Sequence, residues 1–177
     1  MLRIFFISIL LATVKSDYDV NEVLGKWLPA AYHPRGVTTK YCRWFDISLD
    51  NQLKCTCDDG RDTPVLKFTN TNTGSIKAFP AVFINETEIV SPLNNGCTCN
   101  GNHLPYLIMR KVNENYLVMY ILRRDVDPAG QAYSSTVFVK NVPKLSDLQA
   151  VWSSVSDLRD KEPWYLCDTS FFASEDS

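Results

Sequence analysis

The chain has 177 residues, of which 45% are hydrophobic and 21% are charged, and its formal net charge is −2. This length suits one globular domain that buries about two-thirds of its unfolded surface. The near-neutral charge balance gives no electrostatic reason to expect nucleic acid or an anionic membrane as a partner.

The N-terminal stretch is typical of a secretory signal peptide. Arg3 supplies a positive charge, Ile4–Leu11 is an apolar run, and small residues precede Asp17. The run is shorter than the ~20 apolar residues that a membrane-spanning helix needs. We therefore expect a signal peptide over residues 1–16 and a single secreted, extracellular domain over residues 17–177, without stable membrane insertion.

From Trp27 to about Asn141, short β-rich runs alternate with turn residues. Pro80 lies inside one run and should leave it as an edge strand or a broken strand. Even spacing with local turns favours an antiparallel meander that closes into a barrel, with a two-sheet sandwich as the alternative. After a strand that begins near Trp27, the expected strands cover residues 41–48, 53–57, 65–69, 75–84, 88–90, 106–112, 116–123 and 133–140.

The segment after the last strand changes to a helical period. Ser146 is a good N-cap, and Gln149 follows it at the spacing of a capping box. Apolar residues then recur at helical intervals. We expect one amphipathic helix that ends near Asp160 and packs outside the sheet. Pro163 stops the helix, and Trp164–Cys167 is a short extended segment.

Three short pieces of sequence carry a resemblance to the lipocalin family, and the resemblance covers the whole mature chain. Gly25-Lys26-Trp27 matches the first family motif. Asn115–Tyr120 resembles the end of the second motif, whose Thr-Asp-Tyr portion is missing here. The third family motif, in which a basic residue ends the last strand, is resembled by Phe138–Lys140 followed by Pro143–Ser146. The resemblance implies an all-β fold, an eight-stranded antiparallel up-and-down barrel with one C-terminal helix packed outside.

The resemblance also implies a closed barrel floor made by Gly25, Trp27 and Lys140, in which the basic residue covers the indole. Glycine permits a sharp backbone bend before the tryptophan. A cation over an indole face contributes roughly 0.5–2 kcal/mol. Lysine lacks the planar stacking surface of the arginine that is usual in the family, so we expect a weaker contact here.

Six cysteines follow the predicted leader, and an even count in an exported protein favours disulfides. In salivary lipocalins of blood-feeding insects, cysteines at corresponding places join the C-terminal tail to the barrel wall. This resemblance implies a bond between Cys42 and Cys167. Asn85-Glu86-Thr87 is a glycosylation sequon, so Asn85 is a candidate glycosylation site.

The remaining cysteines form a repeated Cys-Thr-Cys, with Cys55, Cys57, Cys97 and Cys99. Residues i and i+2 of a strand point the same way without converging, so we expect each pair to bond to the other pair. A crossed pairing, which joins Cys55 to Cys99 and Cys57 to Cys97, suits antiparallel segments. The uncrossed pairing and a four-cysteine zinc site are the alternatives.

The sequence carries no pattern of an enzyme. His33 and His103 have no neighbouring nucleophile or carboxylate arrangement of a hydrolase, and we interpret both as rim residues. The chain has neither a glycine-rich phosphate loop nor a His-x-x-x-His zinc spacing. We expect a protein without catalytic residues, metal or resident cofactor. A bilin or a haem stays open as a guest, and haem would need an inward histidine.

Aromatic residues make up 12% of the chain, and several lie on the predicted strands. They and two methionines predict an apolar interior pocket. The candidate cavity residues are Trp44, Phe68, Phe79, Tyr106, Met109, Tyr116, Met119, Tyr120 and Phe138. We expect a secreted carrier of a small hydrophobic ligand, such as a lipid, a pigment or an odorant-like molecule. The alternative is a salivary or defensive lipocalin that binds a protein through its surface or sequesters a host mediator.

Overall fold

The computed structural model of the chain describes residues 20–34, 42–52, 55–56, 62–80, 82–85, 88–92, 105–122 and 132–174. The strands are β1 (Gly25–His33), β2 (Phe45–Leu49), β3 (Cys55–Thr56), β4 (Asp62–Thr63), β5 (Val65–Asn70), β6 (Ile76–Pro80), β7 (Val82–Asn85), β8 (Glu88–Pro92), β9 (Pro105–Asn113), β10 (Tyr116–Leu122), β11 (Ala132–Val139) and β12 (Trp164–Tyr165). The described helices are α1 (Leu145–Ser154) and two short 3-10 helices, η1 (Val20–Val23) and η2 (Thr169–Phe171). The predicted signal peptide lies outside the described residues.

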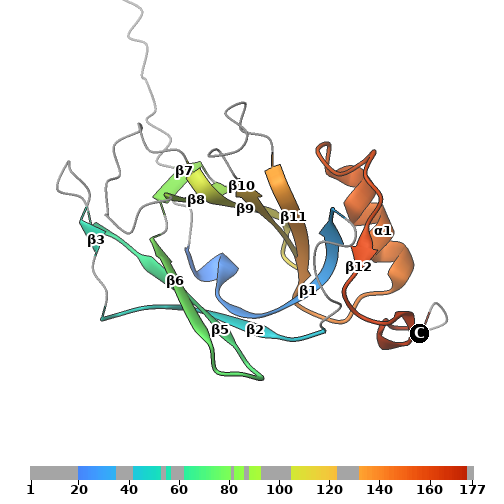
Figure 1. The fold of residues 1–177 in the computed structure, drawn as a ribbon, viewed down its shortest axis with the longest axis horizontal. Coiled ribbons are helices and arrows are strands. Elements are labelled where there is room, and N and C mark those ends of the chain that lie inside the picture. The colour runs from blue at the N-terminus through green and yellow to red at the C-terminus, as the bar shows by residue number, and fades with distance from the viewer. Residues whose placement is uncertain are drawn as a thin grey trace, which may run out of the picture.

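The body of the protein is one strongly curled antiparallel sheet (Figure 1). Its strand order is β6-β5-β2-β1-β11-β10-β9-β8-β7, with β12 beside β1, while β3 and β4 pair separately. Most neighbours in this order are consecutive in the chain, as in a meander. Two pairs of neighbours are exceptions. β2 pairs with β5, because β3 and β4 lie between them and pair separately, and β1 pairs with β11, which brings the first and last long strands together and curls the sheet on itself. The predicted antiparallel meander is confirmed, and the alternative of two stacked sheets is not.

Pro80 divides one predicted strand into two. β6 and β7 are the two ends of the sheet, although only residue 81 separates them in the chain. β6 pairs with β5, whereas β7 pairs with β8. A proline removes one backbone donor from the ladder, which favours a break in pairing at this point. The run predicted over residues 75–84 therefore changes its partner at Pro80, and it links both ends of the curled sheet.

Helix α1 follows β11 and packs on the outer side of the sheet (Figure 1). The predicted capping box at Ser146 is wrong. Lys144 occupies the N-cap position without a side-chain capping bond, and its carbonyl accepts the N–H of Leu148 at 3.2 Å. In the described part of the chain, no helix combines the length and the apolar character needed to cross a membrane.

The helix also ends earlier than its apolar spacing predicts. The backbone becomes extended at Val155, so the expected end near Asp160 is wrong. Turns continue from there, and the N–H of Leu158 donates to the carbonyl of Val155 at 2.9 Å. The indole N–H of Trp152 donates to the carbonyl of Lys161 at 2.8 Å. Leu158 is fully buried beyond the helix, which is why the apolar period alone could not locate the helix end.

The sheet carries an apolar core on each face. The outer core fills the space between the sheet and α1 and contains Leu28, Ala30, Ala31, Val118, Tyr120, Val137, Val139, Leu148, Trp152, Val155, Leu158, Cys167 and Phe172. The inner core lies on the concave face and contains Val23, Trp27, Ile47, Leu66, Phe68, Leu107, Met109, Leu117 and Phe138. Successive residues of a strand point to opposite faces, so the same strands supply both cores.

A disulfide joins Cys42 to Cys167, with 4.6 Å between their Cα atoms, and this confirms the pairing that the family resemblance implies. Just before Cys167, β12 pairs with β1, and the N–H of Leu166 donates to the carbonyl of Ala30 at 2.9 Å. The tail is therefore held to the sheet both covalently and through the backbone.

Candidate functional site

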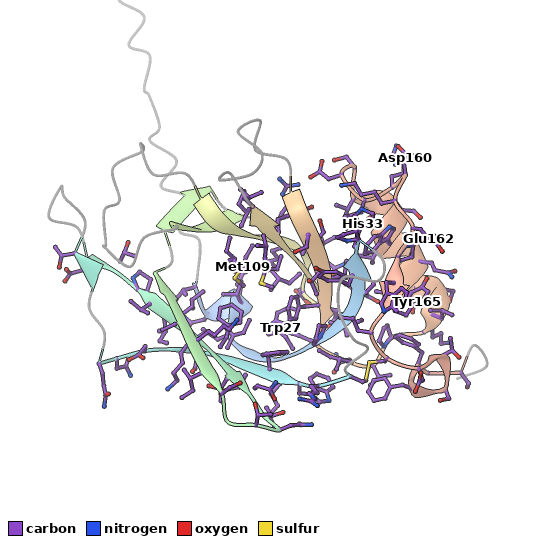
Figure 2. All side chains as sticks on the ribbon, viewed as in Figure 1. Trp27, His33, Met109, Asp160, Glu162 and Tyr165 are labelled. Atoms are coloured by element: carbon purple, nitrogen blue, oxygen red, sulfur yellow. A yellow bond between two sulfur atoms is a disulfide. The ribbon has the colours of Figure 1, made fainter. Side chains whose placement is uncertain are left out.

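The concave face of the curled sheet is an apolar surface supplied by six strands and by η1. Figure 2 shows Trp27 and Met109 inside the curl, while His33, Glu162 and Tyr165 lie on the side of the helix. Beyond the buried inner core, five apolar side chains pack against it and keep part of their surface accessible: Val20, Leu24, Phe45, Leu49 and Met119. Apolar surface that is both concave and accessible is the usual basis of a small-molecule site.

One end of the concave face is closed by Trp27. The indole is 1% exposed, and its N–H donates to the carbonyl of Val23 at 2.8 Å. The Nζ of Lys140 lies 4.9 Å from the centroid of the Trp27 ring and donates to the carbonyl of Glu22 at 3.3 Å. Gly25, two residues before the tryptophan, has a φ of 107°, in the region that favours glycine. These contacts form a floor at which η1, β1 and the end of β11 meet.

A second lysine also contacts η1. The Nζ of Lys111 lies 2.6 Å from the Oε2 of Glu22, and both side chains retain some exposure. Lys111 stands opposite Leu117, whose side chain belongs to the inner core, so β9 carries Lys111 on the concave face. Sequence reasoning did not identify this ion pair. Its members lie 89 positions apart in the sequence and leave no local signal, so only the strand register reveals the pair.

Four of the predicted cavity residues lie on the concave face. Phe68, Met109 and Phe138 belong to the inner core, and Met119 packs against it. The ring of Phe138 meets the ring of Phe45 edge to face, with 6.4 Å between their centroids. These side chains come from strands on both sides of the curl, and together they form one continuous surface.

Three other predicted cavity residues lie on the outer face, which corrects their assignment. Tyr120 belongs to the outer core, and Trp44 and Tyr116 pack against it. In β10, alternation sends the odd-numbered Leu117 and Met119 inward and the even-numbered tyrosines outward. Burial, and then the negative charge of Asp147 on α1, raise the pKa of Tyr116, in keeping with a position beneath the helix.

The remaining predicted sites fall largely outside the described atoms. For three of them, the structure describes the backbone but not the side chain: Phe79, Tyr106 and Cys55. Four others lie outside the described residues: Cys57, Cys97, Cys99 and His103. The pairing of the Cys-Thr-Cys segments thus stays a prediction. Asn85 ends β7, but the rest of its sequon is outside the described residues, so glycosylation also stays a prediction.

His33 lies at the end of β1. Its Nδ1 is 3.4 Å from the carbonyl oxygen of Glu162, in the segment that leads into β12. The two residues lie together on the helix side in Figure 2. His33 stands opposite Ser135, on the face that β11 turns toward the helix. The histidine therefore contributes to the attachment of the tail.

A bulge in β1 brings a tyrosine to the concave face. The register between β1 and β11 shifts between Pro29 and Ala31, and both Ala30 and Ala31 join the outer core. A bulge inserts one residue and resets the alternation of faces. Tyr32 consequently lies opposite Thr136, whose other neighbour is the inward-facing Met119. The sequence alone gave no sign of this reset, so Tyr32 was absent from the predicted cavity residues.

The order of the strands decides what kind of fold this is. An antiparallel meander closes on its first strand, a helix packs outside after the last strand, and a floor is made by Gly25, Trp27 and Lys140. The fold is lipocalin-like. One difference from the expected eight-stranded barrel is the broken strand at Pro80, and another is the added β12.

No protein-family model and no curated protein matches this sequence. Among solved structures, the lipocalin-like chain is similar to the structure described as "Crystal structure of major allergens, Per a 4 from cockroaches". The TM-score is 0.44 at 12% sequence identity, and the match covers 82% of this chain and 86% of that chain. The likeness is distant, and the lipocalin-like assignment rests on the strand order and floor contacts of this chain itself.

Proposed function

We propose that the protein is an extracellular carrier that holds a small hydrophobic molecule on the concave face of its sheet. The supporting observation is the contrast between the two ends of this face. The floor is filled by Trp27, which is almost fully buried. Farther along the same face, Met119, Ile121 and Tyr32 are only partly buried. Accessible apolar surface behind a sealed floor suits a guest that enters from the other end.

An extracellular location is supported by the disulfide between Cys42 and Cys167, because such bonds persist in oxidising compartments. Lipocalin-like folds are typically those of non-enzymatic carriers. Among the described residues, no group of three or more histidine, cysteine, aspartate or glutamate side chains gathers around a common point. Because lipocalin-like folds are typically those of carriers, the proposal assigns binding, rather than a reaction, to the concave face.

Native mass spectrometry of the protein purified from its own source tests this proposal. A carrier should show an added mass that disappears on denaturation and that extraction with organic solvent identifies as an apolar molecule. A protein that carries no added mass, and that also fails to bind neutral apolar probes, would contradict carriage. That result would favour the alternative in which the surface of the protein binds another protein.

The concave face offers a matched pair of variants for the same test. Ile121 of β10 faces the interior and Ile108 of β9 packs against the outer core, and both are partly buried. Ile121→Ala should weaken binding of a neutral apolar probe, whereas Ile108→Ala should leave binding unchanged. The same side-chain deletion on opposite faces separates a loss of the site from a general loss of stability.

A further inference from the structure

One row of side chains crosses five strands on the concave face. Tyr32 stands opposite Trp164 of β12 on one side and opposite Thr136 of β11 on the other. Thr136 stands opposite Met119, and Met119 opposite Met109. Cross-strand partners share a face of the sheet. Because Met109 belongs to the inner core and Met119 packs against it, the whole row faces inward.

The buried polar side chains gather on one strand, β11, and two of them face inward. Among the described residues, the buried polar ones are Ser134, Ser135 and Thr136, which are 2%, 1% and 6% exposed. Ser134 stands opposite the inward-facing Ile121, so Ser134 and Thr136 both face inward. Ser135 faces outward, because it stands opposite Tyr120 of the outer core. Along the described inward positions of β1, β10 and β11, the face is thus apolar except for a cluster of hydroxyl groups, formed by Tyr32, Ser134 and Thr136.

On the strands around the hydroxyl cluster, fixed charges lie at the floor. Across the described inward positions of β1, β9, β10 and β11, the charged side chain is Lys111, and it already contacts the carboxylate of Glu22. Lys140, which follows β11, lies over the indole of Trp27. A buried carboxylate or ammonium group without an opposite charge is strongly disfavoured, whereas a neutral polar group needs only a hydrogen bond. The hydroxyl cluster therefore suits a neutral guest.

We infer that the interior takes a neutral amphiphile, an apolar body that ends in a hydroxyl, carbonyl or ether group. Its apolar body lies along Met109, Met119 and Ile121, and its polar end is bound at the hydroxyl cluster by Thr136 and Ser134, with Tyr32 beside them. This inference rests on the proposed carrier function and adds to it the charge class of the ligand.

A matched series of ligands tests the charge class. Dodecanol, dodecanoate and dodecylammonium share one chain and differ in the end group, so each can compete with the neutral fluorescent probe N-phenyl-1-naphthylamine at neutral pH. We expect dodecanol to bind at least about tenfold more tightly than either ion. Equal or tighter binding of either ion would overturn the inference while leaving carriage intact. Failure of the probe and all three ligands to bind would instead contradict the carrier function.

Three substitutions on one strand test the binding of the polar end. Thr136→Val and Ser134→Ala remove inward hydroxyls and should each weaken dodecanol binding about three- to tenfold. Ser135→Ala removes the neighbouring outward hydroxyl and should leave dodecanol binding unchanged. Circular dichroism and urea unfolding establish whether each variant is folded. If Thr136→Val does not fold, Ser134→Ala, which is the smaller change, still tests the hydroxyl cluster. Equal losses in all three folded variants, or no loss at Thr136 and Ser134, would overturn the assignment of the hydroxyl cluster.

Discussion

Lys140 lies over the indole of Trp27, with its Nζ 4.9 Å from the ring centroid, although the two lie 113 positions apart in the chain. Trp27 belongs to the first strand, and Lys140 directly follows β11. The same lysine donates to the carbonyl of Glu22 in η1. The side chain of Lys140 therefore links β1 and the end of β11 to η1, the short helix that covers the floor.

Removing the lysine should destabilise the floor. Lys140→Met keeps most of the apolar stem but loses the cation over the indole and the hydrogen bond to Glu22. We expect the free energy of unfolding to fall by about 1–2 kcal/mol in urea titrations. Lys140→Arg should retain the stability because its guanidinium also stacks on indole. Lys77→Met, at an exposed lysine of β6, provides the control. An equal fall in the free energy of unfolding in Lys77→Met would contradict a stabilising role of the contact between Lys140 and Trp27.

Breaking the disulfide should cost more than any single floor contact. Cys42 and Cys167 are separated by 125 positions, and the chain-entropy model gives about 4–5 kcal/mol for a loop of that length. The double variant Cys42→Ala/Cys167→Ala should therefore unfold at a markedly lower urea concentration than the wild type. Unfolding at the same urea concentration under non-reducing conditions would show that the bond does not stabilise the native state.

The strand runs were largely predictable because turn residues and β-rich segments alternate in the sequence. Pro80 marked the break in pairing for a physical reason, the missing backbone donor. The tail disulfide was implied by the family resemblance. The face of each residue was harder to predict, because a shift of one position moves a side chain to the opposite face. Tyr116 and Tyr120 were thus assigned to the interior although they face the helix.

The parts that sequence reasoning missed depend on contacts between distant segments. The bulge that turns Tyr32 inward follows from the pairing of β1 with β11. The ion pair of Glu22 with Lys111 needs η1 to lie against β9. The end of α1 was misplaced because Leu158 continues the apolar spacing from a turn. In each case the local sequence fits more than one arrangement, and tertiary packing selects among them.

The position of Tyr116 beneath α1 makes a prediction about alkaline pH. Burial and the charge of Asp147 raise the pKa of this phenol above that of an unfolded tyrosine, about 10. The native state then holds the proton more tightly, so this contribution is complete below pH ~10 and is lost as pH rises through the native pKa. Urea unfolding against pH should show a shallower alkaline decline in Tyr116→Phe than in the wild type.

The charge of Asp147 can be tested separately. Asp147→Asn removes the coulombic cause but leaves the burial of Tyr116, so the pKa of the phenol should fall only part of the way toward its ordinary value. Ultraviolet titration of the phenolate in the folded protein measures this shift. An unchanged tyrosine titration in Asp147→Asn would show that the carboxylate does not act on Tyr116.

The two isoleucine variants should separate binding from stability in opposite ways. Ile121→Ala should weaken binding of a neutral probe about tenfold, because apolar contact area on the concave face is lost. Ile108→Ala should reduce the free energy of unfolding by about 1–2 kcal/mol, because it loosens the outer core, and should leave probe affinity unchanged. Equal effects of both variants on probe binding would contradict a site on the concave face.

The methionines offer the most direct measurement of where a ligand binds. Of the three in the sequence, Met1 lies in the predicted leader, whereas Met109 and Met119 stand opposite each other on the concave face. Methyl NMR of the processed protein labelled at methionine should show both signals shifting on addition of the neutral probe, with the larger shift at the more accessible Met119. Stoichiometric binding that moves neither methyl signal would place the ligand elsewhere and contradict the carrier proposal.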